Sequence, residues 1–88
     1  MVSIDRIKGS LGDFIRRADR YHGRKLEAKI TENISKSLNL LADLLGQEGF
    51  LKEAGKIRMI SAKISRNSEL TQEQIKELRS IFHILESE

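Results

Sequence analysis

The sequence predicts an all-α protein, either a four-helix bundle or a set of stacked antiparallel helical hairpins. Apolar residues recur every three or four positions through most of the chain, which is the period of one face of a helix. No alternating run with β-branched enrichment is longer than four residues, so nothing favours a strand. The stretches between the apolar stripes are short, so consecutive helices should lie antiparallel within a single domain, residues 1–88.

The first two helices are expected at about 4–22 and 24–45. Gly23 is a natural C-terminal residue for the first of them, and if it failed to break the chain the two would fuse into one rod. Gly9 and Gly12 lie inside the first helix, each at a cost of about 1 kcal/mol relative to alanine. They indicate either local fraying or the close approach of another backbone. The apolar stripe of this helix is Ile4, Ile7, Leu11, Phe14, Ala18 and Tyr21.

The last two helices are expected at about 48–65 and 72–85. The final helix has the strongest start signal in the chain, because Thr71 and Gln74 have the spacing of a capping box. Leu70 and Ile75 flank that box at the positions of a hydrophobic staple. The segment between the two helices is polar and short, and its composition is that of a loop.

Residues 35–68 resemble one tetratricopeptide-type helical hairpin, a repeat of about 34 residues. Small residues stand at the family's two small positions, Ala54 and Ser61, but Arg58 replaces a large apolar residue and Arg66 replaces the closing proline. The remaining matches are Leu38, Leu41, Ala42, Leu45, Gly49 and Leu51. The resemblance implies peptide or partner binding and no catalysis, whereas convergent hairpin packing would explain the same small residues.

The composition excludes several classes of protein. The chain has no cysteine, so neither a disulfide scaffold nor a thiolate metal site is expected, and no cofactor or metal is predicted. The longest apolar runs are two or three residues, far below the roughly 18 that a membrane span needs. No export signal is evident, so the expected location is cytoplasmic, with no membrane partner and no evident small-molecule substrate.

Catalytic patterns are weak, and no catalytic residue is predicted. The two histidines are His22 and His83. Asp19 and His22 are three residues apart and could share one helical face. Arg17 and His22 have the R-x4-H spacing of certain helical ribonucleases. Both patterns arise easily by chance on a charged helix. An enzyme acting through either histidine is therefore the third choice. A DNA-reading helix-turn-helix is rejected because inward positions of its second helix would fall on Gln47, Lys52 and Gly55.

The net charge of +3 conceals two basic zones and an acidic last helix. Residues 16–29 and 52–66 each carry a net charge of +4, and residues 67–88 carry −3. With Tyr21 nearby to stack on a base, the basic zones predict, as the runner-up function, a nucleic-acid-binding subunit. The candidate contacts are Arg16, Arg17, Arg20, Arg24, Lys25 and Lys29 in the first zone, and Lys52, Lys56 and Lys63 in the second.

The first-choice function is protein binding, because the apolar residues of the last helix span about 180°, more than the roughly 100° that one buried face needs. Part of that surface is expected to be covered by a second copy or another protein, through Ile81, Ile84 and Leu85. The sequence thus predicts a non-enzymatic interaction module, such as a regulator, an inhibitor or an assembly subunit, that self-associates, most simply as a homodimer.

Overall fold

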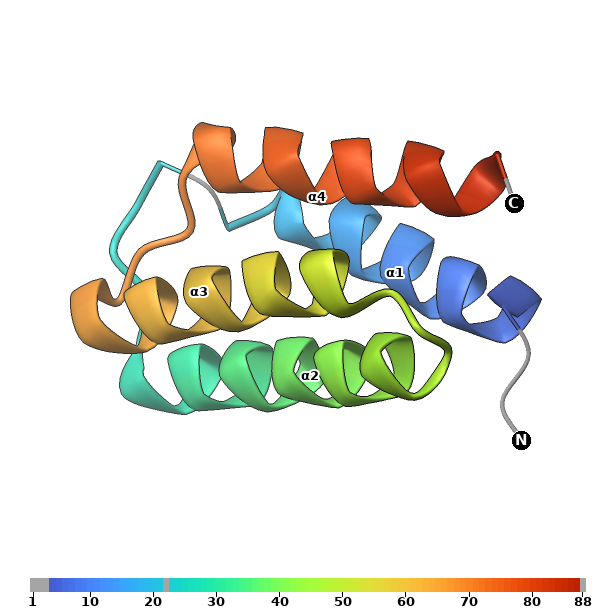
Figure 1. Ribbon diagram of the computed structural model, residues 1–88. Helices are drawn as coiled ribbons and strands as arrows, with labels where there is room; N and C mark the ends of the chain where they lie inside the picture. Colours follow the sequence, from blue (N-terminus) through green and yellow to red (C-terminus); the bar gives the residue numbers. More distant parts are fainter. Residues whose placement is uncertain (1–3, 22, 88) are drawn as a thin grey trace.

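A computed structural model describes residues 4–21 and 23–87, and it confirms the all-α fold (Figure 1). The helices run alternately up and down, with α1 and α4 forming one layer and α2 and α3 the other. Within the described ranges no strand forms, only an isolated bridge between Lys25 and Glu69. The four helices are α1 (Ile4–Ala18), α2 (Ala28–Gln47), α3 (Leu51–Asn67) and α4 (Gln72–Glu86).

The connection between α1 and α2 is longer than predicted, because tertiary contacts hold it in a non-helical conformation. The backbone N–H of Leu26 donates to the carbonyl of Ser68 at 2.7 Å, and the Leu26 side chain is buried. Gly23 has a φ of +83°, which ends any helical continuation. The first helix therefore stops at Ala18, the second begins at Ala28, and the fused rod is wrong.

The third helix begins at Leu51, three residues later than predicted, because Gly49 adopts a φ of +91° and turns the chain. It ends at Asn67, and the following Ser68 has the left-handed conformation. The capping box of α4 is confirmed, since Thr71 Oγ1 accepts from the Gln74 N–H at 3.1 Å and the Gln74 side chain accepts from the Thr71 N–H at 2.9 Å.

The closest pair of helices is α2 and α3, and small residues line their crossing. Ser35 Oγ donates to the carbonyl of Ser61 at 3.3 Å, and Ser61 Oγ donates to the carbonyl of Ser35 at 3.2 Å. Ala42 and Ala54 are buried in the same hairpin. The small residues therefore do let these helices approach closely, while kinship with tetratricopeptide repeats stays a prediction.

The last helix buries more of its apolar residues than predicted. Ile81 and Leu85 are 1% and 0% exposed, so the fold of a single chain already covers them. A single chain therefore already covers two of the three residues predicted for a partner contact, because α4 packs on both α1 and α3. Of the three residues proposed for that contact, Ile84 alone is exposed, at 38%.

Gly9 and Gly12 differ in what surrounds them, and this predicts different effects of alanine. A Cβ on Gly9 would meet nothing within 4 Å, whereas a Cβ on Gly12 would lie 3.2 Å from Phe82 Cε1. Gly9→Ala should therefore raise the free energy of unfolding by about 0.5–1 kcal/mol, through helix propensity. Gly12→Ala should gain less, because the Phe82 ring must shift. Urea denaturation measures both, and an equal gain for the two variants would contradict the packing at Gly12.

Among the described residues, no helix combines the length and the apolarity needed to cross a bilayer.

Candidate functional site

The two predicted basic zones lie on different helices, but they approach each other at the end of the bundle where the N–H of Leu26 donates to the carbonyl of Ser68. The first occupies the end of α1, the connection that follows it and, through Lys29, the start of α2, and the second lies on α3. In the described part of the chain α1 packs against α2 and α4 but not against α3, so the two helices are diagonal to each other. The cations of α1 therefore do not lie alongside those of α3.

Most cations of the first zone are exposed, and the described residues give them no acidic partner. Arg16 pairs with Asp13, and Arg24 Nη2 donates to the backbone carbonyl of Arg20 at 2.5 Å. No carboxylate in residues 4–21 or 23–87 pairs with the other cations of this zone, which are Arg17, Arg20, Lys25 and Lys29. Their charges are thus available to an anionic partner.

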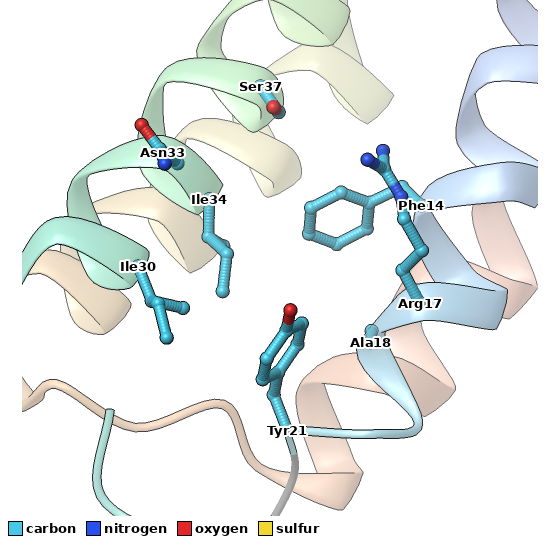
Figure 2. A pocket seen from close by; sticks show the side chains of 8 residues that line it. All are labelled: Phe14, Arg17, Ala18, Tyr21, Ile30, Asn33, Ile34 and Ser37. Atoms are coloured by element: carbon cyan, nitrogen blue, oxygen red, sulfur yellow. The ribbon is translucent and has the colours of Figure 1, made fainter. Parts of the chain in front are cut away.

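A pocket of about 200 Å³ opens between α1 and α2 beside these cations (Figure 2). Its inner surface is apolar, because Phe14, Ala18 and Ile34 are buried core residues and Ile30 is partly buried. Figure 2 shows the aromatic ring of Phe14 and the side chains of the two isoleucines directed into the space between the helices. An apolar group entering here would be covered by α1 on one side and by α2 on the other.

Polar groups surround the opening of this pocket. Arg17 and Tyr21 come from α1 and the chain just after it, and Asn33 and Ser37 come from α2 (Figure 2). The Tyr21 hydroxyl points into the middle of the space. No acidic residue is among the described residues that line the pocket. The site therefore combines an apolar floor with a guanidinium group and neutral hydrogen-bonding groups, which suits an apolar group carrying a negative charge.

A second, wider groove of about 630 Å³ lies between α1 and α4 over Gly12 and Phe82. Three of its cations already have carboxylate partners: Arg16 pairs with Asp13, Lys8 with Asp5, and Arg79 with Asp19 at 3.2 Å. Because these pairs neutralise one another within the chain, this groove has less charge to offer an anion than the α1–α2 pocket has.

Of the two histidines, only His83 lies within the described residues. His22 lies outside the described residues. The His83 ring is exposed, and its Nδ1 lies 3.0 Å from Glu86 Oε1. Asp19 is engaged by Arg79 of α4. Within the described ranges no three histidine, cysteine or acidic residues gather as metal ligands do.

Sequence reasoning selected Arg17 and Tyr21 but missed the α2 side of the pocket. Asn33 and Ser37 are four apart and so share a helical face, but nothing in the sequence says which helix that face meets. The pairing of α1 with α2 at this point is decided by the fold.

The chain matches no family model, no curated protein and no solved structure.

Proposed function

We propose that this protein acts in the cytoplasm by binding another protein, and not by catalysis. In this proposal the α1–α2 pocket receives an apolar side chain from an acidic segment of the partner. The observation that carries it is the position of Arg17, a cation with no carboxylate partner among the described residues, at the edge of a pocket with a buried apolar floor.

The size of the pocket favours a protein partner. Sites for small molecules and cofactors usually enclose about 300–1,000 Å³. The α1–α2 pocket, at about 200 Å³, is smaller and open, and it suits a single anchoring side chain. Protein interfaces concentrate their binding energy in such pockets, where tyrosine and arginine are the residues most often found at the centre. Tyr21 and Arg17 both line the opening of this pocket.

Self-association was predicted from the apolar width of the last helix, and the burial of Ile81 and Leu85 removes that physical reason. The partner in this proposal is therefore a different protein. Light scattering at high protein concentration tests whether the chain self-associates. The expected result is a strict monomer.

Site-directed photo-crosslinking in the host cell tests the proposed function. A photo-reactive residue placed at Asn33, which is exposed at the pocket edge, should yield a discrete protein adduct. The matched control is the same residue at exposed Lys76 of α4, a helix that does not pack against α2 in the described structure. Equal adducts from both positions, or none from Asn33, would contradict the proposal.

Nucleic-acid binding is the second candidate. The observation favouring it is the group of cations at the α1 end without carboxylate partners among the described residues, with Tyr21 beside them. The other candidate contacts lie on α3, which does not pack against α1 in the described chain, and they are Lys52, Lys56 and Lys63. A nuclease-sensitive adduct at Asn33 would favour this candidate over a protein partner, and its yield should fall steeply as salt rises.

A further inference from the structure

We infer that the partner segment is an acidic amphipathic α-helix lying over the α1–α2 pocket and along α2. This inference rests on the proposed function and extends it from one pocket to a whole helix face. It concerns the form and the charge of the ligand, which the pocket alone does not specify.

The α2 side of the pocket continues as a stripe toward the end of that helix. Asn33, Ser37, Leu40 and Leu44 are spaced by four, three and four residues, so they lie on one helical face. The first two line the pocket. Leu40 is 60% exposed, and Leu44 is partly buried against the core. An apolar surface therefore follows the pocket along α2, and nothing in the described chain covers Leu40.

The charges of α2 favour an acidic ligand on this side. Both carboxylates of α2 already form ion pairs: Asp43 pairs with Arg58 of α3, and Glu32 pairs with Lys36 at 3.1 Å. Glu32 also lines the groove between α2 and α3, on the other side of the helix. The α1–α2 side thus holds Arg17 with no described acid opposite it. Carboxylates on a docked segment would supply that missing partner.

A helix fits this surface better than an extended peptide does. Extended peptides that bind by strand addition need a free sheet edge, and the described residues form no sheet. An extended segment would leave its own N–H and C=O groups unpaired against side chains, at a cost of about 1–3 kcal/mol for each buried group. A helix satisfies those groups internally and presents apolar side chains at the same spacing as the stripe on α2.

Two crosslinking positions on α2 measure the form of the ligand. Asn33 and Leu40 are seven residues apart, or about 10 Å along a helix. A helical ligand should therefore be crosslinked at two residues about seven apart in its own sequence. An extended ligand would be crosslinked at residues about three apart, since each residue of a strand rises roughly 3.3 Å. Mass spectrometry of the two adducts identifies those residues.

We expect both positions to capture the same partner segment, with residues about seven apart and a net negative charge between them. Arg17→Gln should lower the adduct yield at both positions by about tenfold, the effect of removing one charge-assisted contact. A separation of about three residues, or a basic segment, would overturn the inference. Crosslinking at Asn33 without crosslinking at Leu40 would also overturn it, while leaving the proposed protein-binding pocket intact.

Discussion

Ile81→Ala should lower the free energy of unfolding by about 2–5 kcal/mol, the range for truncating a fully buried isoleucine. Folded domains are stable by about 0.05–0.15 kcal/mol per residue, so this is a large share of the total for 88 residues. The loss arises because the Ile81 side chain is 1% exposed in the single chain, and its removal leaves a cavity in the core. Urea denaturation followed by circular dichroism measures it.

Ile84 provides the matched control on the same helix. Its side chain is 38% exposed, and Ile84→Ala should cost less than about 1 kcal/mol. The unfolding midpoint of the Ile81 variant should also be independent of protein concentration, since the lost contacts lie within one chain. A midpoint that rises with concentration, or equal losses for the two variants, would restore the interpretation in which a second subunit covers the last helix.

Ser61→Leu should lower the free energy of unfolding by about 2–4 kcal/mol. The serine is 3% exposed and lies where α2 and α3 are held together by reciprocal hydroxyl-to-carbonyl hydrogen bonds. A leucine here would remove one of these bonds and force extra methyl groups between two closely packed backbones, and overpacking alone costs about 1–3 kcal/mol.

Ser61→Ala separates the two causes. It removes the hydroxyl without adding volume, so it should cost only about 1 kcal/mol, the net value of a typical hydrogen bond. Thermal or urea denaturation of both variants gives the comparison. If alanine and leucine proved equally destabilising, the close approach of α2 to α3 would not be what constrains this position.

Local features of the sequence were sufficient to predict the start of the last helix. The signal there acts within one turn of the helix. The structure forms the capping box of Thr71 and Gln74, and it buries the flanking Leu70 and Ile75. The chain segment after α1 shows the opposite case. Its residues have helical periodicity, but a hydrogen bond from Leu26 to the carbonyl of Ser68, far along the chain, holds it extended.

Only the α1 half of the candidate site could be predicted, because the other half comes from a helix distant in sequence. Arg17 and Tyr21 were chosen because the basic charge and the aromatic ring lie close together in sequence. Asn33 and Ser37 complete the pocket from a different helix, and their positions depend on how α2 crosses α1. The amphipathic pattern of each helix says which face is buried, but it does not say which neighbour buries it.

The sequence by itself determined that the fold is all-α, as a four-helix bundle or stacked helical hairpins, because periodicity, capping and glycine turns act over a few residues. The tertiary structure alone decided that Ile81 and Leu85 belong to the core of one chain. It also decided that the basic residues of α1 lie on a helix diagonal to α3 and that a pocket opens between α1 and α2. These properties depend on which helix faces meet, and that is set by the packing of side chains from segments distant in sequence.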